Sequence, residues 1–377
     1  MHGLDRMSNH IVTEDGNVRK FFGRACLSAA LIGSIGSSYA DDFNVANDTV
    51  AEVKYASSLY EPSPTDVNPA EEIQNDSNLE LASYSSRSSG SSVGNWLDNT
   101  VVFTGADIYK SVGDRVTNIA GGPGALSSSY GAVTGFNTGF ALGDSGLRGQ
   151  VGASYGVYDF RGRLAIVPDS TNVEEQGYFT AGVYKRGDMT NNSDPLSYGM
   201  VIDAFASDNW GVNANKVDVG QLRGMVGYAL SDRFEVGGFG TGDLWDDSAA
   251  VTVAGAPGVR REVHAANQFN SYIRGNTLAG GSLMAYTGVF DRANVQSWQF
   301  GATGEAPLSA WFSLYGNCNY AVPSAGAGAG GSGDEQFNIQ FGLCYYFGGK
   351  AISPTVTGQQ GLPLFDLASN SSFLITD

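Results

Sequence analysis

Large apolar side chains alternate with small or polar ones along much of the chain after residue 100. The clearest case is FNIQFGLCYYFGG, residues 337–349, in which every odd position from Phe337 to Phe347 is large and apolar. Because successive side chains of a β-strand point to opposite faces, this pattern predicts a strand with one apolar face. Alternation alone does not decide whether that face packs in a soluble β-sandwich or contacts lipid, since a sandwich strand alternates in the same way.

Runs of this kind follow one another through most of the remaining sequence. Clusters of Gly, Asn, Asp, Ser and Pro separate them, as turns separate strands. We therefore predict twelve strands, at residues 101–109, 131–142, 147–160, 175–186, 196–206, 217–230, 233–242, 264–274, 281–290, 296–306, 310–321 and 335–347.

With two exceptions, GDMTNNSDP at 187–195 and the brief DRANV at 291–295, the links between these runs alternate in length. GDSG at 143–146 and SD at 231–232 are short, whereas residues 110–130, 161–173 and 241–263 form long links. Tight turns at one rim and long loops at the other are typical of a transmembrane β-barrel. The predicted fold class is therefore all-β, an antiparallel up-and-down transmembrane β-barrel of about 12 strands. It occupies residues 101–348, its last strand closes against Val101–Tyr109, and its apolar faces contact lipid.

Two further observations favour lipid contact. After the N-terminal region, no segment approaches the length of apolar run that a membrane-spanning helix needs, so a membrane protein of this sequence must be a closed barrel. The tryptophans fall at predicted strand ends or just outside them, where indole rings form the aromatic girdles of a barrel. The predicted girdle residues are Trp96, Trp210, Trp245, Trp298 and Trp311.

The N-terminal region predicts export. Arg19, Lys20 and Arg24 precede the apolar run Ala25–Ile35, and SSYADD offers a cleavage site after Ala40, so residues 1–40 are interpreted as a signal peptide. Residues 41–100 are acidic and Ser-rich and are predicted to be a disordered periplasmic leader, or alternatively a plug or a peptidoglycan tether. The predicted location is the outer membrane of a Gram-negative-type bacterium.

Composition adds little beyond exclusions. The net charge of −17 argues against nucleic acid as a partner, because phosphate contacts need clustered Lys and Arg. The mature chain keeps only Cys318 and Cys344, and the strand register places them on opposite faces, which argues against a disulfide. No pattern of metal ligands is present, and no cofactor is predicted.

The signal peptide, the alternating strands, the turns ALSDRFEVGGFG and APLSAWFSLYG and the aromatic-rich last strand resemble bacterial outer-membrane β-barrels of the porin kind. The layout, with an acidic leader and a short tail, is also similar to uncharacterised planctomycete secreted or outer-membrane families. The resemblance implies outer-membrane lipid, small solutes and the outer-membrane assembly machinery as partners. It leaves the oligomeric state open. Porin-like chains end at the aromatic residue of the last strand, but here a tail, residues 349–377, follows Phe347. This tail puts the assembly signal in doubt and could instead fold back into the lumen as a plug.

A barrel of this size is wider inside than an eight-stranded one and narrower than a large porin, so the predicted function is a narrow channel for passive passage of small solutes. Arg148, Arg223 and Arg274 could form a basic track that selects anions. Alternatively, these arginines pair with Glu235, Asp203 or Glu305. The predicted pore-lining residues are Arg148, Gln150, Arg223, Gln268, Asn270, Arg274, Asn338 and Gln340.

Evidence for catalysis is weak. His264 in REVHAANQ lacks a nearby nucleophile at a useful spacing and is interpreted as an ordinary histidine at a strand end. Asp243, Asp246 and Asp247 lack the spaced ligands of a calcium loop and are interpreted as a solvated acidic loop. The chain is predicted not to be an enzyme. The alternative to a channel is a non-enzymatic secreted or surface β protein, a sandwich or barrel, that binds a partner through long loops such as SAGAGAGGSGDE at 324–335.

Overall fold

A computed structural model of the chain describes a β-rich region and its C-terminal extension. The predicted signal peptide and almost all of the predicted leader lie outside the described residues. Among the described residues, no helix is long and apolar enough to cross a membrane. The described residues are 96–114, 129–158, 173–188, 194–211, 213–253, 256–291, 296–323, 336–353, 355–356 and 361–376.

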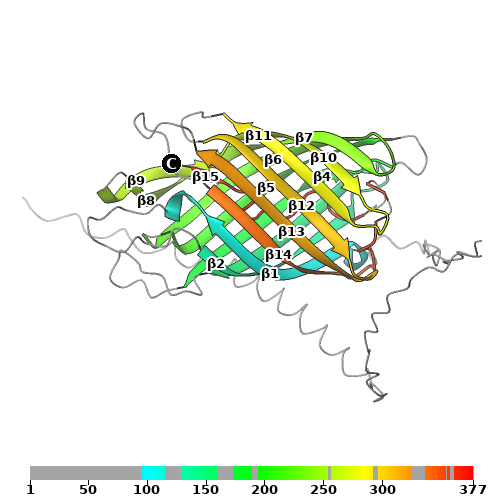
Figure 1. The fold of residues 1–377 in the computed structure, drawn as a ribbon, viewed down its shortest axis with the longest axis horizontal. Helices are drawn as coiled ribbons and strands as arrows, with labels where there is room; N and C mark the ends of the chain where they lie inside the picture. The colour runs from blue at the N-terminus through cyan, green and yellow to red at the C-terminus, as the bar shows by residue number, and fades with distance from the viewer. Residues whose placement is uncertain are drawn as a thin grey trace, which may run out of the picture. The chain divides into compact units, whose positions relative to one another are not determined.

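Twelve antiparallel strands close into a barrel (Figure 1). The first strand meets the last, with Val101 opposite Tyr346 and Lys110 opposite Phe337, so the predicted closure is confirmed. A short 3-10 helix, η1 (Leu97–Asn99), precedes the first strand, and η2 (Val112–Asp114) follows it. The barrel strands are β1 (Thr100–Lys110), β2 (Ser129–Ala141), β3 (Arg148–Tyr158), β4 (Glu174–Lys185), β5 (Leu196–Trp210), β6 (Asn215–Ala229), β7 (Phe234–Trp245), β10 (Gln268–Asn276), β11 (Ser282–Phe290), β12 (Gln296–Pro307), β13 (Phe312–Pro323) and β14 (Gln336–Tyr346).

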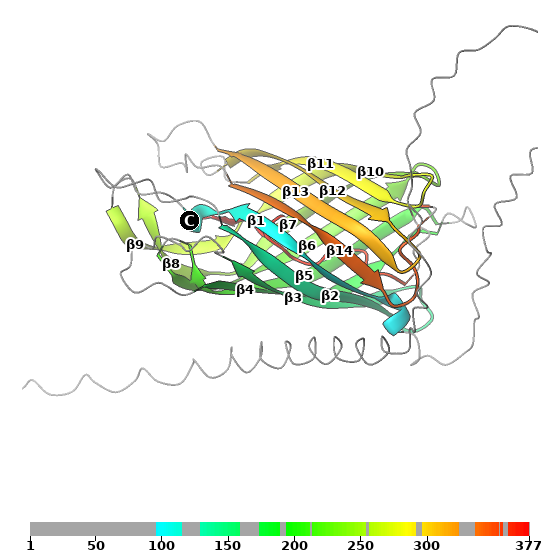
Figure 2. The same cartoon turned by 60° about the horizontal axis from the view of Figure 1, so that its bottom comes forward.

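The prediction of a long loop at residues 241–263 is wrong in part, because these residues contain a β-hairpin. β8 (Asp247–Val253) pairs with β9 (Ala256–Ala265), and β9 also pairs with β15 (Ile375–Thr376) near the end of the chain. His264 therefore belongs to β9 and does not begin a barrel strand as predicted. The glycines and proline around residue 257 suggested a loop, whereas β9 runs through Pro257. Figure 2 shows the hairpin projecting beyond one end of the barrel.

The two ends of the barrel differ. The β2–β3, β4–β5, β6–β7, β10–β11 and β12–β13 links lie at one end, called the short-turn end here, where β1 begins and β14 ends. The hairpin, and the ends of strands that lead into the longer links, lie at the opposite end, called the long-loop end. The chain therefore enters and leaves the barrel wall on the same side, as an even number of strands requires.

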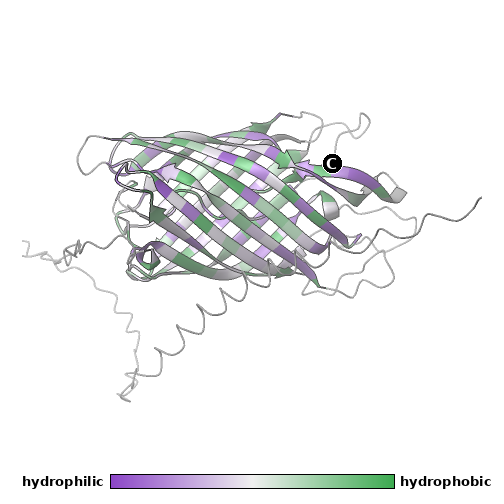
Figure 3. Ribbon diagram, turned by 180° about the vertical axis from the view of Figure 1, so that it is seen from behind, coloured by the Kyte–Doolittle hydropathy of each residue, from purple (hydrophilic) through white to green (hydrophobic). Residues whose placement is uncertain are grey.

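The side chains of each strand divide between the outer and inner faces. On β14, Phe341 and Leu343 point outward and are 55% and 45% exposed, while Gln340 points inward and is buried. Figure 3 shows hydropathy alternating along the strands. Cys344 is buried on the inner face and Cys318 is exposed on the outer face, and both are free thiols, as predicted.

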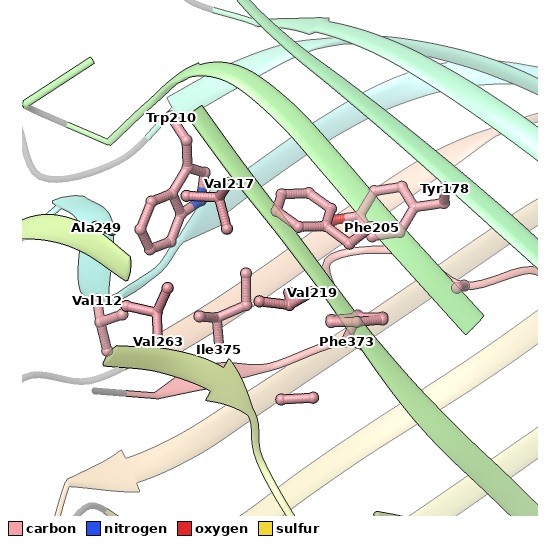
Figure 4. Packing of buried hydrophobic residues seen from close by; sticks show 12 residues of the cluster. Val112, Tyr178, Phe205, Trp210, Val217, Val219, Ala249, Val263, Phe373 and Ile375 are labelled. Carbon is pink, nitrogen blue, oxygen red and sulfur yellow. The ribbon is translucent and has the colours of Figure 1, made fainter. Parts of the chain in front are cut away.

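One predicted girdle residue is placed differently. Trp210 is 1% exposed and packs in an apolar cluster with Val112, Val217 and Val263, where the hairpin covers the end of β5 (Figure 4). It was predicted outward because it ends a strand, but the hairpin that buries it was not foreseen. The other four tryptophans, Trp96, Trp245, Trp298 and Trp311, are 38–52% exposed.

The seam between β1 and β14 depends on small residues. Gly105 lies directly opposite Gly342, and the ring of Tyr315 covers both from the inside. A Cβ atom at Gly342 would lie 2.1 Å from the Thr104 carbonyl oxygen and 2.8 Å from the Tyr315 ring. The closing pair therefore has no room for a side chain on the inner face.

We predict that Gly342→Ala weakens barrel closure. Overpacking of this kind costs about 1–3 kcal/mol, because the backbone must shift to relieve the clash. The measurement is the urea concentration at which the folded protein in detergent loses its β-sheet circular dichroism. Gly316→Ala is the matched control, since a Cβ there would face outward and meet only the Gln340 carbonyl oxygen at 3.6 Å. Equal midpoints for the two variants would contradict the prediction.

Candidate functional site: the lumen and its C-terminal segment

After β14 the chain turns back into the barrel. The hydroxyl of Tyr184, near the short-turn end of β4, donates to the carbonyl oxygens of Gly361 and Leu362, whereas Ile375 pairs with Ala265 on the hairpin at the other end. Residues 361–376, called the luminal segment here, therefore run the length of the interior. Figure 2 shows the red C-terminal trace between the barrel walls. The sequence interpretation of the tail as a plug agrees with these contacts.

The start of the tail is fixed at the short-turn end. Lys350 Nζ donates to Asn99 Oδ1 at 2.6 Å, and burial lowers the pKa of its ammonium group. Ser353 N donates to the Gly280 carbonyl oxygen at 2.9 Å, and Asn276 Nδ2 donates to the Ser353 carbonyl oxygen at 3.0 Å. The tail thus packs on the turn between β10 and β11 before it enters the lumen.

One wall of the barrel, formed by β2 to β6, holds the main chain of the luminal segment. The side-chain amide of Gln150 pairs with Phe365 twice, donating to its carbonyl oxygen at 2.8 Å and accepting from its N–H at 3.2 Å. Asn137 donates to the same carbonyl oxygen at 3.0 Å. Thr180 Oγ1 accepts from Ala368 N at 3.0 Å. Side chains of the wall therefore take the place that a neighbouring strand would have in a sheet.

Nearer the long-loop end, the luminal segment is held from several sides. Gln221 on β6 donates to the Ser372 carbonyl oxygen at 3.2 Å, and Gln336 on β14 donates to that of Ile375 at 3.1 Å. Asn319 on β13 donates to the carbonyl oxygen of Ser371. Because β6 lies across the barrel from β13 and β14, the segment fills the lumen at this level.

Asn370 uses its whole side-chain amide in this region. Its Nδ2 lies 3.0 Å from Asp107 Oδ2, 3.2 Å from the Tyr158 hydroxyl and 2.9 Å from Gln176 Oε1. Its Oδ1 accepts from the Tyr178 hydroxyl at 2.8 Å. These partners come from β1, β3 and β4. The Asn370 side chain therefore connects the segment to three strands. We call this group of hydrogen bonds the Asn370 latch.

Apolar side chains anchor the segment on either side of this latch. Leu364 and Phe365 belong to a buried cluster that includes Tyr184 and Met225. Phe373 and Ile375 belong to the cluster around Trp210, where the Phe373 ring centroid lies 5.8 Å from that of Phe205 (Figure 4). Burial of such side chains supplies most of the favourable energy of a packed segment, because apolar area leaves water.

Two of the three arginines of the predicted basic track, Arg223 and Arg274, pair with carboxylates of the wall. Arg223 Nη2 donates to Asp203 Oδ1 at 3.1 Å, and its Nε lies 3.0 Å from Asp203 Oδ2. Arg274 Nη1 donates to Glu235 Oε1 at 3.2 Å. Pairing with these carboxylates is the alternative that the sequence left open. Arg148 lies half-buried on the inner face at the short-turn end of β3.

The remaining predicted lumen residues also lie on the inner face. Gln268 and Asn270 contact each other at 3.1 Å, and both accept from the Gln299 amide. Asn338 donates to Asp107, and Gln340 Oε1 accepts from Asn317 at 2.8 Å. That the predicted residues line a path for solutes stays a prediction. Strand parity could have added Asn137 and Thr180, but no periodic signal marks Asn370.

Small cavities remain between the luminal segment and the wall formed by β10 to β14. Their volumes are about 160, 120 and 70 Å³, and Asp366 lines all three. Thr303 lines them also, and Glu305 lines the two larger ones.

The residues considered for catalysis and calcium binding have structural contacts. His264 lies opposite Thr376 in the β9–β15 ladder. Asp243 Oδ1 accepts from Ala265 N at 3.2 Å, and Asp247 Oδ2 accepts from Asp218 N at 2.9 Å. In the described part of the chain, no group of three or more His, Cys, Asp or Glu side chains is placed to hold a metal ion.

Comparison with known families and structures gives one family match. A model described as "Family of unknown function (DUF6666)" matches residues 99–375. No curated protein matches the sequence.

Solved structures with partial similarity include an outer-membrane channel from Pseudomonas putida F1, at 12% identity and TM-score 0.41, covering 66% of this chain and 95% of that one. The NanC porin has 8% identity and TM-score 0.37, covering 65% and 98%. An anion-selective porin from Comamonas acidovorans has 11% identity and TM-score 0.26, covering 65% and 97%. Similarity at this level carries no information on function.

We predict that Asn370→Ala loosens the luminal segment. Removing the amide leaves buried Asp107 and Gln176 with fewer partners, at a cost of about 1–3 kcal/mol, so opening of the segment becomes about tenfold or more frequent. Hydrogen–deuterium exchange of peptides from residues 361–376 measures this. Ser371→Ala is the control, because the Ser371 hydroxyl contacts only Ser369, within the segment itself. The same exchange rate in both variants would refute a role for the latch.

Proposed function

The chain belongs to this family of unknown function, and from the barrel itself we propose an outer-membrane channel without catalytic activity, for passive passage of small solutes. One observation carries the proposal. A closed ring of strands presents large apolar side chains outward around its wall and polar side chains inward.

The outward face is unlike the surface of a soluble protein. Met200, Ile202, Val226, Phe269 and Phe300 come from four different strands, and each is 48–63% exposed. Soluble monomers rarely expose contiguous apolar area of this extent. In lipid, the same face is favourable, and a closed ring leaves no strand edge with unpaired main-chain groups. This favours the channel over the alternative, a secreted β protein that binds a partner through its loops.

The proposed orientation follows from the two ends of the barrel. Barrels of the outer membrane have short periplasmic turns and longer extracellular loops. The short-turn end would then face the periplasm, and the hairpin would lie outside the cell. Trp96 and Trp311 would mark the periplasmic interface, and Trp245 and Trp298 the outer one. Cleavage of the signal peptide near Ala40 and recognition of β14 by the assembly machinery are parts of the same proposal.

With the luminal segment inside the barrel, the structure corresponds to a closed state of the proposed channel. Near the long-loop end the segment is held from several strands on different sides of the lumen. A solute that crosses the lumen at this level would therefore have to displace the segment. We infer that the C-terminal segment gates the channel.

The first prediction tests the barrel in detergent. Unboiled protein is expected to migrate differently from boiled protein on an SDS gel, because the closed ring offers SDS no edge at which to begin unfolding. The protein is also expected to require detergent to stay in solution. Equal mobility, together with solubility in plain buffer, would favour the loop-binding β protein instead.

A second prediction tests the gate with a disulfide. Thr180 Oγ1 lies 3.0 Å from Ala368 N, which places the two Cα atoms within about 7 Å, close enough for a bridge between cysteines at these positions. In the Thr180→Cys, Ala368→Cys variant, oxidation is expected to reduce single-channel openings in planar bilayers at least about tenfold, and a reducing agent to restore them. Thr180→Cys alone controls for the substitution. Openings that survive oxidation would contradict gating by the segment.

A further inference from the structure

We propose that the lumen wall is a binding site for an apolar-rich peptide largely without regular secondary structure, and that residues 361–376 are its resident occupant. The ligand class follows from the groups that the wall contacts. The inference concerns binding, and it rests on the proposed channel only for the route by which a peptide would reach the lumen.

The wall contacts mainly the main chain of the segment. Among the described residues, Asn370 is the only residue of the segment whose side chain is seen to hydrogen-bond the wall. Main-chain contacts do not depend on side-chain identity, so a wall of this kind can accept the backbone of other peptides. The carbonyl oxygens that accept from the barrel or the hairpin are those of Gly361, Leu362, Pro363, Phe365, Asp366, Ser371, Ser372, Leu374 and Ile375.

The wall also holds acceptors that the resident segment does not use. Gln221 Oε1, Gln299 Oε1, Asn319 Oδ1 and Asn338 Oδ1 are buried and have no hydrogen-bond partner among the described residues. All four residues are at most 3% exposed. Buried amide oxygens are normally paired, and an extended peptide supplies an N–H at almost every residue. These atoms therefore fit a strand that offers more N–H groups to the wall than the resident segment does.

Two apolar clusters set a preference on top of backbone recognition. Leu364 and Phe365 fill one cluster, and Phe373 and Ile375 fill the other. Small and polar residues lie between them. A preferred peptide therefore carries large apolar side chains near both ends of a stretch of about the same length, separated by small polar residues.

The test uses the full chain with its resident segment displaced. Phe365→Asp combined with Phe373→Asp puts a carboxylate into each apolar cluster, which is unfavourable for burial, while the ring of strand pairs is unchanged. Ile352→Asp is the matched control, because Ile352 is 47% exposed in the same tail. The probe is a fluorescein-labelled peptide of the sequence GLPLFDLASNSSFLIT, and its anisotropy with detergent-solubilised protein reports binding.

The double variant is expected to bind the probe at least about tenfold more tightly than the Ile352→Asp protein, in which the tethered segment competes at high effective concentration. An unlabelled peptide that keeps Leu364, Phe365, Asn370, Phe373 and Ile375 in place and has its other residues reordered should compete with an affinity within about tenfold, because the remaining contacts of the wall are to the main chain. Maltohexaose, an oligosaccharide of comparable reach, should not compete.

Absence of probe binding to the folded double variant would overturn the proposal. So would competition by the original sequence alone, which would make the wall specific for its own tail, or equal competition by maltohexaose. Should the double variant lose its heat-dependent gel shift, native protein refolded in detergent with excess probe replaces it, and the probe is expected to copurify. Failure there also overturns the inference. The binding assay does not measure current, so it is independent of the channel proposal. A barrel that binds the peptide but does not conduct would contradict the channel proposal and still support the peptide site.

Discussion

Everything else in this molecule depends on the closure of the main-chain hydrogen-bond ladder around the barrel. β1 pairs with β14 along its length, so the ring of twelve strands has no free edge. Closure divides the side chains of each strand into an outer and an inner set, and a shift of one residue in a strand would exchange the two. The outward apolar surface and the polar lumen are thus two consequences of one constraint. The glycine pair under Tyr315 lets the first and last strands approach closely enough to close the ring.

A ring of this size leaves an interior that its own side chains do not fill. The luminal segment occupies that space, and the chemistry of the wall matches a polypeptide. Amide side chains carry both a donor and an acceptor, so they can pair with either main-chain group without introducing net charge. The Gln150 amide does both with Phe365. Arg223 and Arg274 keep their charge within the wall, paired with Asp203 and Glu235.

The contacts that hold the luminal segment differ between its two ends. Near the short-turn end, wall contacts on β2 to β6 leave cavities on the opposite side, lined by Asp366 and Thr303. Near the long-loop end, the Asn370 latch and the amides of β6, β13 and β14 surround the segment, and the hairpin covers its end. In the proposed channel the second region would obstruct the lumen, and the first leaves space beside the segment. A pore and a peptide site are therefore compatible uses of the same interior.

The sequence by itself determined the strands, their faces and the closure of the last strand on the first, because alternation is a local property of each strand and is written in its residues. It also identified inward residues such as Gln150 and Asn338 and the opposite faces of the two cysteines. Only the tertiary structure decided the burial of Trp210, the β8–β9 hairpin, the pairing of Arg223 with Asp203 and the course of the tail. Some of these features bring together residues that are far apart in sequence. The others lie in segments without the alternating pattern of a strand. Which groups meet inside a barrel depends on its diameter and on what fills it, and no local pattern along the chain records either.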